Sequence, residues 1–278
     1  MIAPYDMHAH TYYSPCGRRL TADGQPSATP ALYRDEARRL GLQTIYLTDH
    51  LVQDPTDPAA PQFYKGSGPA ILADLRHELA RLGYADGVRF LVGCETETFS
   101  TEQVGIGPAL AAQLDIVLVP TSHYHLPGAP QPESMAPADV ARHMLILLAS
   151  VVAKPWLDVI AHPFAENEAL IGDLRAIWEA MDRAWLIDIL GEAARVKMAV
   201  EANAACLQDP AIPHYREVMA QFLPLARAQG CRLTIGSDAH QVDMLAWPLE
   251  VEGWLRDIGL VEADFMTPEE VAARRNRV

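Results

Sequence analysis

The sequence predicts an α/β fold of seven parallel strands, and two observations lead to this prediction. First, seven short runs that are apolar throughout alternate with segments of helical spacing along the 278 residues, which is typical of strands buried on both faces of a parallel sheet. Second, every run ends on His, Asp or Glu at its C-terminal side. In a barrel these ends meet at one mouth, whereas in an open sheet they would be spread along an edge. The favoured architecture is therefore a distorted, TIM-like (β/α)7 barrel with its site at the C-terminal ends of the strands.

The first run ends on His8 and His10. Side chains on a strand repeat every two residues, so both imidazoles point the same way and could share one metal ion. A loop rich in Ser, Pro, Gly and Asp follows over residues 11–29. Thr29 and Pro30 then predict the start of a helix, and Gly41 predicts its end.

The remaining elements repeat this order. Strands are expected over residues 43–50, 89–95, 115–125, 157–162, 197–203 and 231–240. Helices are expected over residues 30–40, 70–82, 137–153, 167–182, 184–195 and 213–229, with a last one opened by Thr267, Pro268, Glu269 and Glu270. Residues 1–278 are expected to form a single domain, with the helical segments of about 241–278 packed on the barrel.

Composition narrows the choice of partners. The net charge of −14 opposes binding to a nucleic-acid polymer or to an anionic membrane surface. The longest apolar run, residues 144–153, is too short to cross a bilayer, which argues against a membrane partner. The four cysteines are scattered and there is no basic-then-apolar leader, so a cytoplasmic protein is expected. The oligomeric state is not specified by any of these features.

The strand ends collect residues that bind metal ions. The candidates are His8, His10, His50, Glu95, His123, His125, His162, Asp238 and His240. Nitrogen and carboxylate ligands without a cysteine cluster suit Zn, Mn or Fe in a catalytic site. This set exceeds the needs of one tetrahedral ion, so two or three divalent ions are expected, with a carboxylate such as Glu95 as a bridge. Any single one of these residues could instead be a helix cap or a satisfied polar group.

Six short motifs occur in order at these strand ends, over residues 6–240. They are His8-Ala9-His10, Thr48-Asp49-His50, Gly93-Cys94-Glu95, the Ser122-His123 region, Ala161-His162-Pro163 and Gly236-Ser237-Asp238-Ala239-His240. The set resembles the ordered motifs of the polymerase and histidinol phosphatase (PHP) superfamily. The resemblance implies a distorted seven-stranded barrel, up to three metal ions and phosphoester hydrolysis.

The resemblance also implies three groups of ligands. By position it suggests one metal between His8, His10, Glu95 and Asp238, a second held by His50 and His240, and a third held by Glu95, His123 and His162. His123 is favoured over His125 because Thr-Ser-His is most similar to the family's small-residue approach to that ligand. His125 could then support the site or touch the substrate.

One departure concerns the second metal. Family members with three metals usually supply another histidine from the loop after the first strand, and residues 11–49 contain none. Cys16 lies near that place and could serve as a thiolate ligand, or it could be merely packed. The second metal would accordingly be differently coordinated, weak or absent.

Other polar residues have weaker assignments. Glu201 and Asn203 end the sixth run and are read either as support for the site or as structural residues. His77, His143 and His214 fall in helical segments and are expected to be solvated or core histidines. Arg18, Arg19 and Lys65 lie on loops at the mouth and could bind phosphate oxygens, or could simply be solvated.

The leading hypothesis is a metal-dependent phosphoesterase that acts on a small phosphorylated metabolite or nucleotide through a metal-activated hydroxide. His125, another histidine or water would protonate the leaving group, and Arg18 or Arg19 would neutralise phosphate oxygens. The alternatives are a metal-dependent C–N bond hydrolase of the amidohydrolase type and a catalytically silent metal-binding module. Substrate choice is expected to depend on loops 11–29, 51–69 and 125–137.

Overall fold

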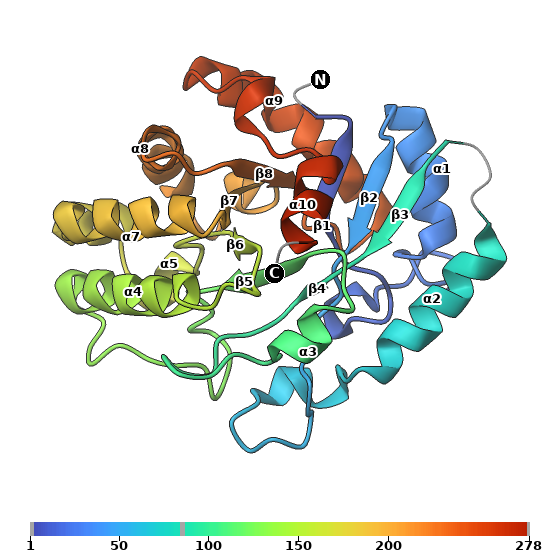
Figure 1. Cartoon of the computed structure of the whole chain (residues 1–278), viewed down its shortest axis with the longest axis horizontal. Helices are drawn as coiled ribbons and strands as arrows, with labels where there is room; N and C mark the ends of the chain where they lie inside the picture. Colours follow the sequence, from blue (N-terminus) through green and yellow to red (C-terminus); the bar gives the residue numbers. More distant parts are fainter. Residues whose placement is uncertain (1–2, 84–86, 277–278) are drawn as a thin grey trace.

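The strands of this protein all pair in parallel (Figure 1). The computed structural model describes residues 3–83 and 87–276. One sheet contains β1 (Tyr5–Ala9), β2 (Thr44–Leu47) and β3 (Arg89–Val92). The other contains β4 (Cys94–Glu95), β5 (Val117–Pro120), β6 (Val159–Ala161), β7 (Ala199–Asn203) and β8 (Leu233–Gly236). The predicted α/β fold with parallel strands is confirmed.

The predicted strand over residues 89–95 is divided in two, which is a correction to the sequence analysis. β3 pairs with β2 and β4 pairs with β5, and the chain changes partner at Gly93. The Gly93 N–H donates to Leu47 O at 2.9 Å, and the Cys94 N–H donates to Ile116 O at 3.1 Å. A Cβ at position 93 would lie 2.6 Å from Ile116 O, so only glycine fits where the strand crosses between its neighbours.

The carboxyl ends of the first and last strands also lie side by side. The Asp238 N–H donates to His8 O at 2.7 Å, and the His10 N–H donates to Ala239 O at 2.8 Å. Ala9 and Ala239 form a parallel bridge, and a second bridge joins His50 to Glu95. The ends of β1, β2, β4 and β8 are therefore brought close together.

Helices cover the outside of the strands, with α1 and α2 beside β1–β3 and with α4, α7 and α8 on the opposite side (Figure 1). The helices are α1 (Pro30–Leu40), α2 (Ala70–Leu82), α3 (Pro108–Ala111), α4 (Pro137–Val152), α5 (Glu168–Ile171), α6 (Leu174–Ala180), α7 (Arg183–Arg195), α8 (Tyr215–Ala228), α9 (Trp247–Asp257) and α10 (Pro268–Arg275). Short 3-10 helices lie at Pro15–Gly17, Gln62–Gly66, Cys206–Gln208, Val242–Ala246 and Glu262–Asp264.

Local capping explains most helix ends. Thr29 accepts a hydrogen bond from the Leu32 N–H and Gly41 takes a left-handed conformation, as predicted for α1. Thr267 and Glu270 form the capping box that opens α10. The single helix expected over residues 167–182 is wrong. Gly172, at φ 86°, ends α5, and Asp173 caps a new helix by accepting from the Arg175 N–H.

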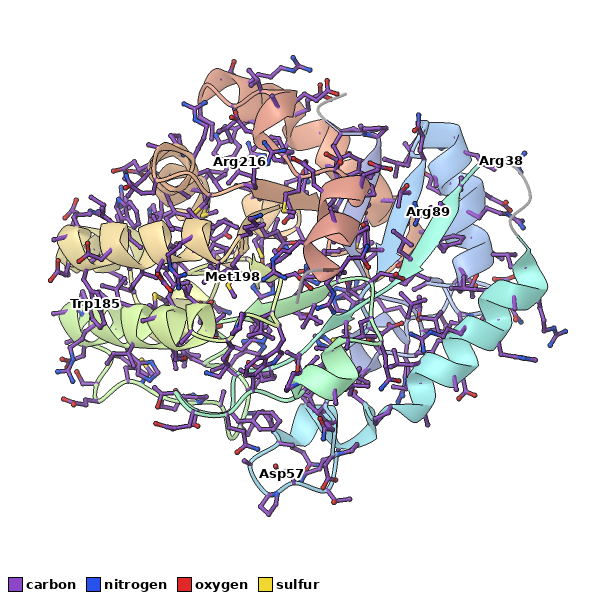
Figure 2. All side chains as sticks on the ribbon, viewed as in Figure 1. Arg38, Asp57, Arg89, Trp185, Met198 and Arg216 are labelled. Atoms are coloured by element: carbon purple, nitrogen blue, oxygen red, sulfur yellow. The ribbon has the colours of Figure 1, made fainter. Side chains whose placement is uncertain are left out.

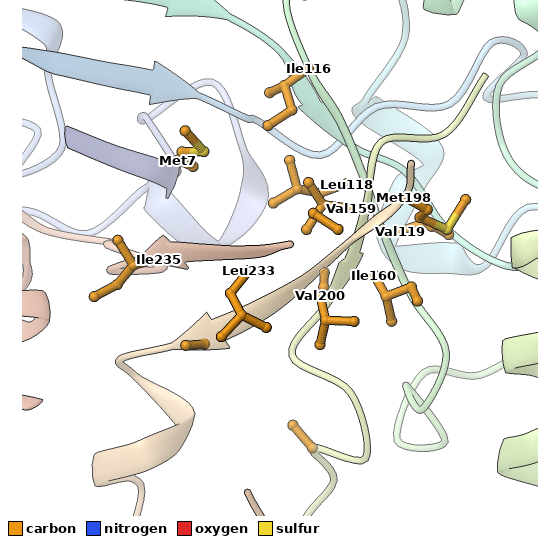
Figure 3. Packing of buried hydrophobic residues seen from close by; sticks show 14 of the residues in the cluster. Met7, Ile116, Leu118, Val119, Val159, Ile160, Met198, Val200, Leu233 and Ile235 are labelled. Carbon is orange, nitrogen blue, oxygen red and sulfur yellow. The ribbon is translucent and has the colours of Figure 1, made fainter. Parts of the chain in front are cut away.

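The core is formed by the strands and the inner faces of the helices. Leu118, Val119, Ile160 and Val200 from three adjacent strands pack together (Figure 3). Met198 lies in the interior, whereas Arg38 extends from the outer face of α1 (Figure 2). Because apolar side chains fill both faces of the strands, the polar side chains at the strand ends stand out as exceptions.

A buried ion pair ties the C-terminal helix to the amino ends of the strands. Arg274 on α10 pairs with Asp158, which precedes β6, and the two residues are 4% and 2% exposed. The Arg274 guanidinium also donates to Leu157 O at 2.6 Å and to Lys197 O at 2.7 Å. Burial raises the pKa of Asp158, and the opposing charges of Arg274 and Arg275 limit that rise. The charge of each partner is tolerated here because the other is present.

We predict that Arg274→Ala destabilises the protein by about 3–5 kcal/mol, because it leaves a buried carboxylate with too little positive charge beside it. Urea denaturation would measure this as a lower unfolding midpoint at constant slope. Arg195→Ala is the matched control, since Arg195 makes an exposed pair with Glu192 within α7 and should leave the midpoint unchanged. Equal midpoints for the two variants would show that the buried pair does not hold the helix in place.

Candidate metal centre

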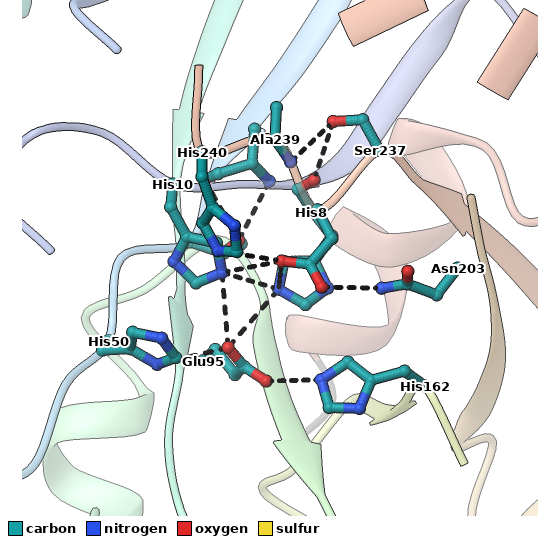
Figure 4. Close-up of polar contacts among 12 residues, drawn as sticks. His8, His10, His50, Glu95, His162, Asn203, Ser237, Ala239 and His240 are labelled. Atoms are coloured by element: carbon teal, nitrogen blue, oxygen red, sulfur yellow. Dashed lines mark hydrogen bonds and ion pairs between the residues drawn. The ribbon is translucent and has the colours of Figure 1, made fainter. Parts of the chain in front are cut away.

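Four side chains from three strand ends converge on one point (Figure 4). His8 Nε2 lies 3.0 Å from His10 Nε2, 3.5 Å from Glu95 Oε2 and 3.5 Å from Asp238 Oδ1. His10 Nε2 lies 3.3 Å from Glu95 Oε2 and 3.2 Å from Asp238 Oδ1. The register of β1 places both imidazoles on the same side, and the parallel order of the strands brings the two carboxylates to them.

The spacing of these atoms fits a bound ion. Ligands that hold a zinc ion in a tetrahedron at 2.0–2.1 Å lie about 3.3–3.4 Å from one another. Five of the six distances between these four donor atoms range from 3.0 to 3.5 Å. His8 Nδ1 lies 2.8 Å from Glu201 Oε1, so its proton belongs there and the Nε2 lone pair faces the centre. The residues present therefore suit a divalent cation.

Glu201 and Asn203 on β7 hold this arrangement in place. Glu201 Oε2 accepts from the His162 N–H at 2.7 Å, while its other oxygen contacts His8. Asn203 Nδ2 donates to Glu201 Oε2 and to Asp238 Oδ2, both at 3.2 Å. Of the two roles proposed from the sequence, contact with the site is the one observed.

The electrostatics of the cluster favour positive charge at its centre. Burial opposes protonation of His8, but the charges of Glu201, Asp238 and Glu95 raise its pKa well above the usual range. Burial likewise opposes ionisation of Glu95 and Asp238, but the neighbouring histidines hold the pKa of both carboxyls well below the usual range. A divalent cation would supply the same charge compensation.

Two candidate ligands lie in strained backbone conformations. His162 has φ 25° and Asp238 has φ 54°, which are left-handed values that L residues rarely adopt. His162 directly follows β6, and Asp238 lies two residues after the end of β8. Strain of this kind persists where the surroundings enforce it, as at binding and catalytic sites.

A second group of donors shares Glu95. Glu95 Oε1 lies 2.8 Å from His162 Nε2, and the His162 ring stacks on His123 at 4.9 Å. Donor atoms of all three residues lie within 4.8 Å of one another. His123 Nδ1 lies 2.7 Å from Glu97 Oε2, which leaves its other nitrogen for the group. The sequence analysis did not find Glu97, although its position two residues after Glu95 was a usable signal.

A third group of donors contains His10, Cys16 and His240, and His50 lies beside His10. The His10 ring lies 4.5 Å from the His50 ring and 4.9 Å from the His240 ring. Donor atoms of His10, Cys16 and His240 lie within 4.8 Å of one another. Burial opposes ionisation of Cys16, yet the neighbouring His10 and His50 lower the pKa of its thiol to about 3.

An open cleft of about 370 Å³ lies beside these groups, lined by His123, His162 and Asp238 on one side. His125 lines the cleft as well, with 52% of its side chain exposed. Its Nδ1 lies 3.0 Å from the buried Glu166 Oε2, and this hydrogen bond raises the pKa of His125. Glu166 was not found from the sequence, where it appeared only as one carboxylate in the loop after His162.

The predicted cations of the mouth do not line this cleft. The exposed Arg18 donates to Tyr13 O at 3.4 Å, and Lys65 donates to Asp57 O at 3.1 Å. Arg19 donates to Gln241 Oε1 at 3.4 Å, next to His240. Contact of Arg18 or Arg19 with a phosphate stays a prediction. Of the two, Arg19 contacts the residue that follows the candidate ligand His240.

Of the three histidines predicted to lie in helices, two do so and one does not. His77 is exposed on α2 and His143 Nδ1 lies 3.1 Å from Tyr124 Oη, so both behave as expected. His214 occupies the N-cap position of α8, without a side-chain capping hydrogen bond, rather than lying within the helix, which corrects the expected helix start. It contacts Glu168 at 2.7 Å and Asp173 at 3.5 Å, and both carboxylates also accept from backbone N–H groups at helix starts.

Within residues 3–83 and 87–276, none of the helices combines the length and apolar character that a membrane span requires. This agrees with the absence of a long apolar run in the sequence.

The chain is similar to two curated proteins that carry the name phosphatase. It is 24% identical over 236 residues to a protein named "Probable phosphatase" from Vibrio atlanticus, covering 84% of this chain and 77% of that protein. It is 23% identical over 236 residues to a protein of the same name from Caldanaerobacter subterraneus, covering 84% and 75%. A search against protein-family models found no match.

The fold is similar to that of a solved histidinol phosphate phosphatase from Lactococcus lactis, a structure in complex with zinc, L-histidinol and phosphate. The TM-score is 0.58 at 17% identity, and the match covers 92% of this chain and 94% of the other. At this identity the likeness concerns the fold. The names of the two relatives and the fold shared with a histidinol phosphate phosphatase agree with the resemblance that the strand-end motifs predicted.

Proposed function

We propose that this protein is a metal-dependent phosphoesterase that hydrolyses a small phosphorylated substrate, such as a metabolite or a nucleotide. The observation that carries the proposal is the set of four donor atoms from His8, His10, Glu95 and Asp238, which are spaced as around one ion, with Asp238 also lining a cleft. The names of the two curated relatives support the reaction type, and the zinc in the Lactococcus lactis structure supports the kind of cofactor.

We further propose two or three divalent ions, with Zn, Mn and Fe as candidates. The first would be held by His8, His10, Glu95 and Asp238, a second by His50 and His240, and a third by Glu95, His123 and His162. These residues would hold the ions, which when bound would supply an activated water and positive charge beside the phosphoryl oxygens. Supporting this proposal, Glu95 presents one oxygen to His8, His10 and His50 and the other to His162.

The same proposal includes the finer architecture. We infer a distorted seven-stranded barrel in which β3 and β4 count as one bent strand and β8 returns to β1. The bridge between Ala9 and Ala239 supports this arrangement. We also propose that residues 1–278 form one domain, although the ends of this range lie outside the described residues. The contacts of Arg274 with Asp158 and with the turn before β7 support the packing of segment 241–278 on the barrel.

The side chains of the cleft would bind the leaving group and move one proton. His125, protonated and hydrogen-bonded to Glu166, would donate its proton to the leaving oxygen. Glu201 and Asn203 would fix the orientation of the His8 and Asp238 side chains through their hydrogen bonds. Among the described residues that line the cleft there is no Lys or Arg. The positive charge that a phosphate needs would therefore come from the metal centre, with Arg19 as the nearby candidate on the loop after β1.

We predict that Asp238→Ala binds less metal than the wild-type protein. Its phosphatase activity should fall by more than roughly 10–100-fold, which is the loss typical when a hydrogen-bond partner of a metal ligand is removed. Elemental analysis and assays on the same samples, after reconstitution with Mn and Zn, would measure both. Asp243→Ala removes an exposed carboxylate from the following turn and should keep metal and activity.

A panel of phosphomonoesters, phosphodiesters and amides would test the reaction type. Hydrolysis of amides alone would replace the proposal with a C–N bond hydrolase. Bound metal without any hydrolysis would favour a silent metal-binding module. A wild-type protein that binds no metal after reconstitution would overturn the metal centre itself.

The pair of His125 and Glu166 leads to a pH prediction. Protonated His125 donates, so the rate should fall as pH rises through the pKa of His125, which Glu166 raises. Glu166→Gln removes that effect and should move the basic limb of the pH–rate profile to lower pH. His125→Asn should abolish the limb and lose about 10²–10⁴-fold activity on alkyl phosphates.

His125→Asn should lose little activity on p-nitrophenyl phosphate, because nitrophenolate is a weak base that leaves without protonation. Equal losses on both substrates would show that His125 has another role.

A further inference from the structure

We propose that the Cys16 thiolate is a ligand of a divalent ion bound between Cys16, His10 and His240, beside His50, and that it makes this position selective for thiophilic metals. The inference rests on the proposed metal centre, but it concerns a residue for which the sequence leaves two readings open. A thiolate is a soft ligand that favours Zn²⁺ or Co²⁺, whereas carboxylate and water suit Mg²⁺ and Mn²⁺.

The Cys16 thiol lies beside two candidate histidine ligands. Cys16 lies in the 3-10 turn Pro15–Gly17, in the loop after β1. Donor atoms of Cys16, His10 and His240 are all within 4.8 Å of one another. Ligands around one zinc ion, with bonds of about 2.0–2.3 Å, lie roughly 3.3–3.7 Å apart. Small movements of the side chains would bring the thiol into contact with an ion between these residues.

The turn that carries Cys16 is fixed to the candidate ligands. The Ser14 hydroxyl oxygen accepts from the His50 N–H at 2.8 Å and lies 3.4 Å from His10 Nδ1. At the start of the loop, the Thr11 N–H and hydroxyl both donate to Asp49 at 2.7 Å. The turn also packs closely, because a Cβ at Gly17 would lie 2.1 Å from Thr11 O. Cys16 is therefore held beside the histidines rather than carried on a free loop.

His240 and the neighbouring His50 are held in position as well. His50 Nδ1 lies 3.1 Å from Tyr64 Oη and 3.2 Å from Glu95 Oε2. His240 Nε2 lies 3.5 Å from Asp238 Oδ1. In Figure 4 the His240 ring lies next to His10 above the carboxylate of Glu95, and the His50 ring lies to the left of that carboxylate. The position is thus adjacent to the first group and shares its carboxylates.

The other cysteines differ from Cys16. Cys231 is buried and its thiol donates a hydrogen bond to Leu190 O at 3.2 Å. Among the donor groups found in the described part of the chain, Cys16 is the cysteine that joins histidines. A merely packed thiol would not need to face two imidazole donors.

Cobalt substitution provides the first test. Protein stripped of metal and reconstituted with Co²⁺ should show a near-ultraviolet thiolate-to-cobalt charge-transfer band. Cys16→Ser should lose this band and about one equivalent of metal, while Cys231→Ser, the matched control, should keep both. Circular dichroism and retention of the remaining metal would show that Cys16→Ser is folded.

Alkylation provides a second readout that does not depend on activity. Iodoacetamide should label Cys16 in the metal-free protein and should be blocked by Zn²⁺ but not by Mg²⁺, as measured by peptide mass spectrometry. In competition, the wild-type protein should prefer Zn²⁺ over Mn²⁺ at this position, and Cys16→Ser should lose that preference.

Failure of this inference differs from failure of the proposed function. If the wild-type protein binds metal but shows no charge-transfer band, and Cys16→Ser keeps every equivalent, Cys16 is a packed thiol and the phosphoesterase proposal stands. If the wild-type protein binds no metal at all, both proposals fall.

Discussion

The arrangement of the mouth depends on one buried carboxylate. Glu95 is 2% exposed and lies within 3.5 Å of imidazole nitrogens from His8, His10, His50 and His162, which belong to three other strand ends. A lone buried carboxylate would be strongly unfavourable, so it requires positive charge around it. The histidines provide that charge when protonated, and a divalent ion would provide it more completely. The Gly93 crossing that sets the direction of β4 is what places Glu95 at the centre of this group.

The molecule separates its stabilising interactions from its chemistry. At the amino ends of the strands, Arg274 and Asp158 form a buried pair that anchors the last helix. At the carboxyl ends, His162 and Asp238 hold strained backbone conformations and four donor atoms face one another at close range. A fold can keep such an unfavourable cluster only if the rest of the structure enforces it. The apolar strands and the ion pair at the opposite end supply that enforcement.

The hydrogen-bond partners of the candidate ligands have a consistent chemistry. His8 contacts Glu201, His123 contacts Glu97, and His125 contacts Glu166, each through Nδ1. Carboxylates at Nδ1 fix the tautomer and the ring orientation and increase the basicity of the other nitrogen. The first two pairs direct Nε2 toward the proposed ions. The third lies in the open cleft, where a more basic imidazole is suited to carrying a proton instead.

The sequence by itself determined the parallel α/β fold and most of the candidate site. Apolar runs ending on His8, His10, His50, Glu95, His162, Asp238 and His240 are local patterns, and strand polarity alone brings such ends to one edge. The caps of α1 and α10 were equally local. Only the tertiary structure decided the rest, because it depends on contacts between distant segments. The division of the third strand at Gly93 follows from contact with Ile116. Glu97 and Glu166 can be recognised as hydrogen-bond partners of His123 and His125 only in the folded chain. The position of Cys16 against His10 and His240 likewise requires a loop and a strand end that are far apart in the chain to meet.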